Sequence, residues 1–185
     1  MMRTISALVL AAAMLPSASF GASLVSAYTD LNLDKCKLVQ SDEVGGTWAC
    51  KGLNGYPLVV AEGDLRMTVS YGKNARDEVA MSQGFAPFNH LGTKIEWLNP
   101  ANTAKKPVAT ILRWYLQQGE GPGESQILVV TQLKPGAVCQ IAWIDATANK
   151  NANELARRAA TELAGDFDCE GMPQIYGEFE AFEIE

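Results

Sequence analysis

The chain contains little of the chemistry that most catalytic and metal sites require. His90 is the only histidine among 185 residues, and the four cysteines include no C-x-x-C pair. A serine or cysteine nucleophile needs a histidine base, and zinc sites draw on clustered cysteine and histidine. The glycine-rich stretch 119–124 carries two glutamates and lacks the lysine and hydroxyl residue of a phosphate-binding loop. We therefore predict no metal, no cofactor and no catalytic residue, and we expect His90 in a surface loop.

Long apolar runs are absent except at the amino terminus. Ile5–Leu15 is an uncharged, mostly apolar stretch of eleven residues that follows Arg3 and precedes small residues. A membrane-spanning helix needs about 20 apolar residues, so this pattern is typical of a cleavable secretory signal peptide. We assign residues 1–22 to it, with cleavage after Ala22 and with Gly21 and Ala27 as alternatives. No cysteine stands at these positions to carry a lipid. The prediction is a soluble periplasmic or secreted protein without a membrane anchor.

A surplus of basic residues is also absent, because the formal net charge is -6. Without Arg3, 14 basic residues face 21 acidic ones, and seven of the acids lie in residues 166–185, which contain no base. Residues 23–165 then balance at 14 of each sign. Nucleic acid and anionic membranes bind to concentrated basic surfaces, so neither is a predicted partner. The acidic carboxy terminus is either a solvated tail or an attractor for a cationic protein.

Four cysteines in an exported chain predict disulfides, and four cysteines allow three pairings. Cys36 and Cys50 lie on two candidate strands joined by a turn, so they can close a short loop. Cys139 begins a strand, and a helix follows before Cys169. Seven strand residues advance the chain by about 3.3 Å each, and sixteen residues of a helix lying antiparallel to the strand return it by about 1.5 Å each. The two lengths are similar, so Cys169 comes back beside Cys139. The predicted disulfides are therefore Cys36–Cys50 and Cys139–Cys169.

The clearest helical pattern lies in residues 152–164, where alanine and leucine recur at helical spacing. Asn151 is the expected N-cap, with Glu154 three residues later, and Gly165 is expected to end the helix. Small residues on the apolar stripe allow this helix to lie close to a sheet. Arg157 and Arg158 fall on the opposite face, where we expect a solvated surface.

Most of the remaining chain has the period of two that is typical of strands. We expect strands at residues 35–40, 47–51, 56–61, 65–71, 94–98, 108–117, 126–133 and 138–145, and one or two helical turns at 75–81. The predicted fold is α+β, with a meandering antiparallel sheet of six to eight strands, one carboxy-terminal helix packed on a face, and two disulfides. One globular domain is expected at 23–170, followed by an acidic tail at 171–185. Alternating apolar residues in this tail leave open an edge strand or disorder.

One set of residues is a candidate binding surface. If Leu65, Met67 and Val69 face the core, Arg66 and Ser70 project from the opposite face of that strand. Arg113 and Tyr115 then lie on a neighbouring strand. These four residues, namely Arg66, Ser70, Arg113 and Tyr115, form a hypothetical polar binding face. The alternative is an ordinary solvated sheet face.

A second hypothesis is a carboxylate-dependent hydrolase that acts on envelope polysaccharide. Paired carboxylates perform acid and base catalysis in glycosidases, and the candidates are Glu62, Asp64, Glu96 and Asp145. Aromatic residues could line such a sugar site, or they could belong to the core; these are Trp48, Trp97, Trp114, Trp143 and Tyr115. We favour the non-enzymatic hypothesis because no residue spacing brings two carboxylates together.

Several segments resemble a group of small exported bacterial proteins without an assigned activity. They are Leu31–Cys36, Trp48–Cys50, Ala61–Arg66, Val69–Gly72, Ala109–Arg113 and Asn151–Arg157. Val69–Gly72 also resembles the serine-containing inhibitory loop of periplasmic lysozyme inhibitors. The resemblance to the exported group implies export, and neither resemblance assigns a catalytic residue. The absence of a catalytic set and the uneven charge favour a non-enzymatic binding or inhibitory module for a protein partner in the cell envelope, such as a cationic protein.

Overall fold

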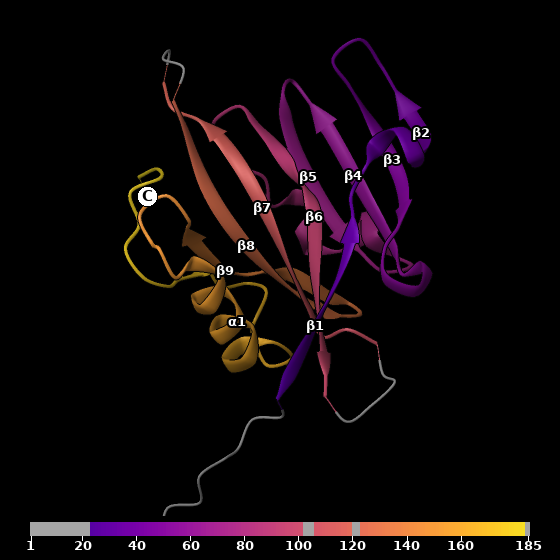
Figure 1. Ribbon diagram of the computed structural model, residues 1–185. Coiled ribbons are helices and arrows are strands. Elements are labelled where there is room, and N and C mark those ends of the chain that lie inside the picture. Colours follow the sequence, from indigo (N-terminus) through magenta and orange to yellow (C-terminus); the bar gives the residue numbers. More distant parts are fainter. Residues whose placement is uncertain (1–22, 102–105, 120–122, 184–185) are drawn as a thin grey trace, which may run out of the picture.

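The computed structural model describes residues 23–101, 106–119 and 123–183 (Figure 1). The predicted signal peptide at 1–22, part of the predicted hairpin tip at 120–122, and residues 184–185 lie outside the described residues. The strands are β1 (Leu24–Asp30), β2 (Lys37–Ser41), β3 (Gly45–Lys51), β4 (Pro57–Gly63), β5 (Arg66–Tyr71), β6 (Asn89–Pro100), β7 (Ala109–Gln117), β8 (Glu124–Lys134), β9 (Ala137–Asp145) and β10 (Gln174–Ile175). The helices are α1 (Ala152–Leu163) and the short 3-10 turns η1 (Leu33–Lys35), η2 (Leu53–Gly55), η3 (Ala75–Asp77) and η4 (Val79–Ser82).

The strands form two sheets. The large sheet has six strands in the order β1-β6-β7-β8-β9-β10, and the small sheet has four in the order β2-β3-β4-β5. Neighbouring strands are antiparallel, except that β10 runs parallel to β9. The predicted α+β class, the helix on a sheet face and both disulfides are confirmed. The strands are divided between two sheets, a division that strand patterns alone do not specify.

The chain is arranged in three layers. Helix α1 packs against β8 and β9 on one face of the large sheet, and the small sheet covers the other face (Figure 1). Val60, Val69 and Tyr71 of the small sheet share a core with Trp97 and Trp114 of the large sheet. Alternate residues of each large-sheet strand therefore face either the helix or the small sheet.

Helix α1 follows the apolar stripe that the sequence predicts. Its buried residues are Ala152, Leu155, Ala156, Ala159 and Ala160, and the alanines allow the helix backbone to approach the sheet closely. The helix ends at Leu163, one residue before the predicted end. Asn151 occupies the N-cap position, but its side chain makes no capping hydrogen bond.

The segment between β5 and β6 lies on the face of the large sheet that the small sheet covers, and it reaches from β5 to β9. Two helical turns form there, η3 and η4, where one or two are predicted. The carboxylate of Glu78 accepts hydrogen bonds from the backbone N–H groups of Gly136 and Val138, at 2.8 and 3.0 Å. Phe85 is buried against Trp114. This segment therefore ties the β8–β9 hairpin to the small sheet.

The acidic carboxy terminus is packed on the domain through residue 183. The edge-strand alternative is confirmed, because β10 pairs with β9. Phe182 contacts Trp143 and Phe85, and the backbone N–H of Glu180 donates to Asp145 at 3.0 Å. The acidic side chains of this segment are thus attached to a fixed backbone.

Both predicted disulfides are present. Cys36 and Cys50 have Cα atoms 4.7 Å apart, and Cys139 and Cys169 have Cα atoms 5.7 Å apart. The second disulfide joins β9 to the segment that follows α1, as the strand and helix lengths predict.

Candidate functional site

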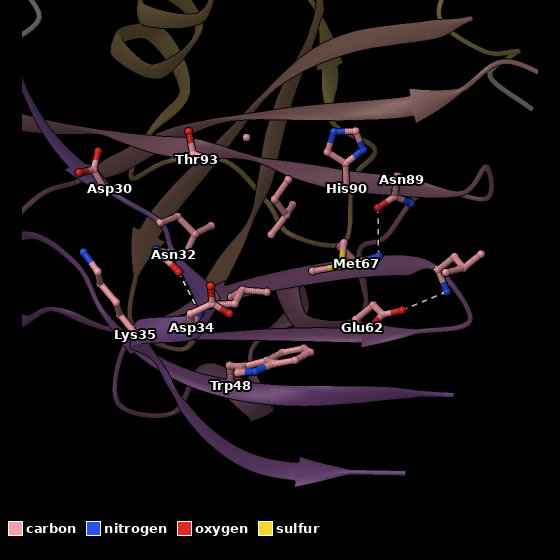
Figure 2. Close-up of a pocket in the computed structure, with 15 residues that line it drawn as sticks. Asp30, Asn32, Asp34, Lys35, Trp48, Glu62, Met67, Asn89, His90 and Thr93 are labelled. Atoms are coloured by element: carbon pink, nitrogen blue, oxygen red, sulfur yellow. Dashed lines mark hydrogen bonds between the residues drawn. The ribbon is translucent and has the colours of Figure 1, made fainter. Parts of the chain in front are cut away.

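The two sheets meet at Asn89, where β6 begins, and separate beyond it. The backbone N–H of Asn89 donates to the carbonyl of Leu65 at 2.9 Å. Its side-chain Oδ1 accepts from the N–H of Met67 at 3.0 Å. Because β6 then diverges from β5, a groove opens between β6 and the inner face of the small sheet (Figure 2).

The groove has a volume of about 760 Å³ and walls of mixed character. Its apolar wall consists of Leu31, Leu33, Trp48, Leu65, Met67 and Leu91, and its polar residues include Asp30, Asn32, Asp34, Lys35, Glu62 and His90. Trp48, Glu62 and Met67 share one face of the small sheet, as the β3–β4 and β4–β5 registers require. Figure 2 shows these side chains on the side of the small sheet that faces β6.

Trp48 lies on the groove wall because its neighbours on β3 are small. A Cβ atom at Gly46 would come within 2.9 Å of the Trp48 ring, so glycine allows the ring to lie along the strand. The ring is partly exposed, whereas Trp97, Trp114 and Trp143 are buried in the core. Three tryptophans are thus core residues, and Trp48, which is partly buried, packs against the same core while it lines the groove.

Three carboxylates, from Asp30, Asp34 and Glu62, line the groove, and Lys35 is the lining base. Asp30 pairs with Lys94 at 2.8 Å, just outside the groove, and the hydrogen bond and charge of Lys94 lower the pKa of Asp30. Glu62 accepts from the backbone N–H of Leu65 at 3.3 Å and has no ion pair within the part of the chain that the structure describes. The groove therefore carries a negative balance beside its apolar wall.

A smaller hollow of about 330 Å³ adjoins the groove and shares Leu65, Asn89 and His90 with it. The rings of His90 and Tyr115 stack in parallel, with centroids 4.7 Å apart. The His90 Nδ1 atom lies 3.6 Å from a carboxylate oxygen of Glu124. The prediction of His90 in a loop is wrong, because the residue lies on β6.

The structure does not bring the four predicted binding residues onto one face. Arg66 is on β5, an edge strand of the small sheet, whereas Arg113 and Tyr115 are on β7 inside the large sheet. Ser70 is completely buried, so it is inaccessible to a partner. The predicted common polar face is therefore wrong. The prediction fails because the alternation of side chains tells which residues of one strand share a face. It does not tell which strands belong to the same sheet.

Two of these residues border the hollow. Arg66 lies over the Phe88 ring at 4.6 Å from its centroid, pairs with Asp64 at 2.6 Å, and donates to the carbonyl of Ala86 at 2.7 Å. Phe88 and Tyr115 both line the hollow. Arg113 is directed elsewhere, because its Nη1 donates to the side chain of Gln126 at 2.8 Å.

Two of the four candidate carboxylates are buried among structural partners. Glu96 is buried, and it accepts hydrogen bonds from Arg157 at 2.6 and 3.2 Å and from the Ser26 hydroxyl at 2.5 Å. Asp145 is buried and accepts backbone hydrogen bonds after β9 and from the carboxy-terminal segment. Arg157 is therefore an anchor of α1 to the large sheet, and the expectation that it is simply solvated is wrong.

Sequence reasoning missed Asp30 and Leu33 as groove residues. Leu31–Cys36 contributed only to a resemblance, and no pattern in it indicates a cavity wall. Its role depends on the short turn η1, in which Asn32 Oδ1 accepts from the Asp34 N–H at 2.9 Å. This turn directs the chain from β1 of the large sheet to β2 of the small one, and thereby closes one end of the groove.

All four cysteines are in disulfides, and among the described residues no group of three histidine, cysteine or acidic side chains stands close enough to hold a metal ion. No helix in residues 23–101, 106–119 and 123–183 has both the length and the apolar character to cross a membrane. Comparisons with protein-family models, with curated protein sequences and with solved structures find no match to this chain. The groove and its chemistry are therefore the basis for a functional proposal.

Proposed function

We propose that the protein is an exported, non-enzymatic binding protein whose groove holds a cationic segment of a protein partner in the cell envelope. The observation that carries this proposal is the combination of an exposed apolar wall with carboxylates inside one groove. Two disulfides support export, because they persist in oxidising compartments.

The apolar wall supports binding rather than an open solvated surface. Leu65 is 59% exposed, and Trp48 is partly exposed beside it in the groove. Tryptophan is enriched among the residues that dominate protein interfaces. Covering these side chains removes apolar surface from water, which is worth about 25 cal/mol per Å² before the costs of association.

The carboxylates support a cationic occupant. Asp30, Asp34 and Glu62 face a single lining lysine, and Glu62 has an oxygen without a partner among the described residues. A lysine or arginine side chain that reaches Glu62 forms a charge-assisted hydrogen bond. An anionic occupant would meet the same carboxylates and be repelled.

A phage-displayed peptide library panned on the folded protein tests this proposal. We expect enriched peptides to combine basic and apolar residues. Their binding should change the fluorescence of Trp48, since the other three tryptophans are buried in the core. It should weaken at high salt, because salt screens exposed charge attraction beyond about 8 Å at physiological ionic strength.

Matched variants locate the binding site. Glu62→Gln in the groove should weaken peptide binding about tenfold, which corresponds to about 1.4 kcal/mol. Glu170→Gln in the acidic carboxy-terminal segment removes the same charge outside the groove and should leave the affinity unchanged. Loss of binding in Glu170→Gln but not in Glu62→Gln would move the site to the carboxy terminus and reject the groove.

A further inference from the structure

The backbone of Leu91 points into the groove. In an antiparallel strand, the N–H and C=O groups of alternate residues point to the same edge. The Asn89 N–H points to the edge away from β7, because it bonds to Leu65. The Thr93 carbonyl points the same way, because it accepts from the Leu31 N–H at 2.8 Å. The register of β6 with β7 is regular from Asn89 to Leu91 and shifts between Leu91 and Ile95. Because Leu91 lies two residues after Asn89 in the regular part, it directs its own N–H and C=O toward this edge.

Residues 89–93 form an open edge of β6 whose two ends are closed. The register of β1 with β6 ends at Asp30 opposite Lys94, and η1 then carries the chain away toward the small sheet. At the other end Leu65 is bonded to Asn89. Four residue steps of about 3.3 Å give an opening of about 13 Å along the strand. An extended segment of three to four residues has this length.

Carboxylates stand at both ends of this opening. Glu62 lies at one end, where its side chain accepts from the Leu65 N–H. Asp30 lies at the other end, next to Leu31. Between them the side chain of Leu91 belongs to the apolar wall and packs against the core that the two sheets share. Asp30 is already paired with Lys94, so the opening combines an apolar centre with one carboxylate, that of Glu62, which has no ion pair among the described residues.

We propose that the cationic segment binds as an extended strand whose central residue pairs with the backbone of Leu91. The partner residue opposite Leu91 is apolar, because its side chain lies on the same face as the Leu91 side chain. Residues two positions away on either side share that face, and a basic residue at one of these positions reaches Glu62 on the inner face of the small sheet. Strand addition of this kind takes affinity from main-chain hydrogen bonds and specificity from alternate side chains. This inference rests on the proposed function and adds the conformation and sequence pattern of the occupant.

A defined probe tests the inference by NMR titration of the folded, disulfide-bonded protein. The probe is the blocked pentapeptide acetyl-Lys-Thr-Val-Thr-Lys-amide, whose lysines share the face of the central valine in an extended strand, and its control carries an N-methyl group on that valine. We expect the amide resonance of Leu91 and the indole resonance of Trp48 to shift with the first peptide. The N-methylated peptide, which lacks the donor for the Leu91 carbonyl, should bind at least tenfold more weakly.

A pair of variants examines the same bond from the side of the protein. Leu91→Pro removes the N–H, and the fold should tolerate it because an edge N–H without a partner is where strands accept proline. Leu91→Ala retains the N–H and removes the same apolar side chain. We expect the probe to bind Leu91→Ala at least fivefold more tightly than Leu91→Pro.

The outcomes separate this inference from the proposed function. Equal affinity of the two peptides, with shifts at Trp48, overturns strand pairing and leaves a cationic occupant in place. Failure of the pentapeptide, while library-selected peptides still perturb Trp48, also overturns the extended conformation alone. Failure of both the pentapeptide and the library overturns the proposed function together with this inference.

Discussion

Replacing Arg157 by alanine tests how α1 is attached to the large sheet. The side chain of Glu96 is 8% exposed, and that of Arg157 is 42% exposed. Removing one partner of a buried ion pair costs about 3–5 kcal/mol, because it leaves an uncompensated charge. Water reaches Arg157, and Ser26 still donates to Glu96 in the variant. We therefore expect the free energy of unfolding to fall by about 2–3 kcal/mol.

The assay is urea unfolding at pH 7, followed by circular dichroism. The hydrogen bond to Glu96 raises the pKa of Arg157 above its ordinary value, so Arg157 is charged at this pH and its loss leaves the buried carboxylate without its cation.

Arg158→Ala is the matched control. This residue neighbours Arg157 on α1, but it is exposed and lies 3.9 Å from the exposed Glu162, so its loss should cost less than about 0.5 kcal/mol. Combining Arg157→Ala with Glu96→Gln should recover part of the lost stability, because an amide leaves no buried charge. Equal losses in the two alanine variants, or no recovery in the double variant, would refute this reasoning.

Three further predictions concern other parts of the molecule. Replacing Cys139 and Cys169 by alanine opens a loop with a sequence separation of 30, and urea unfolding should show a loss of about 3.5 kcal/mol. Burial raises the pKa of Tyr71 from 10.0 to about 12; the folded state keeps a proton that the unfolded state loses, so stability should fall between about pH 10 and 12, and Tyr71→Phe should flatten that decline by up to about 2.7 kcal/mol. The proposed export predicts a mature chain with the mass expected after a cut at Ala22, because a cut after Ala27 would remove the first four residues of β1.

Local patterns predicted much of the fold because they report interactions between near neighbours. The hairpins β7–β8 and β8–β9 join adjacent strands through short turns, and the period of two identifies them directly. The disulfide from Cys139 to Cys169 followed from the lengths of one strand and one helix. In contrast, β1 was missed, since it pairs with β6 more than sixty residues later. No local pattern encodes a pairing at that separation.

The prediction of Ser70 as an accessible binding residue was wrong for a related reason. Met67, Val69 and Tyr71 are buried, as the alternation predicts, but Ser70 on the opposite face is buried as well. The turns η3 and η4 pack against β5, and the alternation within a strand contains no information about such a third layer. Leu65 shows the converse failure. It continues the apolar pattern, yet it lies in a turn with φ of 60° and is exposed.

The groove could not be predicted from the sequence alone, because its residues come together only through the registers of the strands. Its wall residues come from β1, η1, β3, β4, β5 and β6, and in the sequence they look like ordinary core or surface positions. The binding surface arises because β1 and β6 differ in length at this end of the sheet. The last residue of β1, Asp30, pairs with Lys94, whereas β6 already begins five residues earlier, at Asn89. That mismatch in strand length leaves Leu91 with an unpaired edge between two carboxylates. The same alternation that misplaced Ser70 assigns a direction to the backbone of Leu91, because the register with β7 is regular from Asn89 to Leu91 and Asn89 has an observed partner.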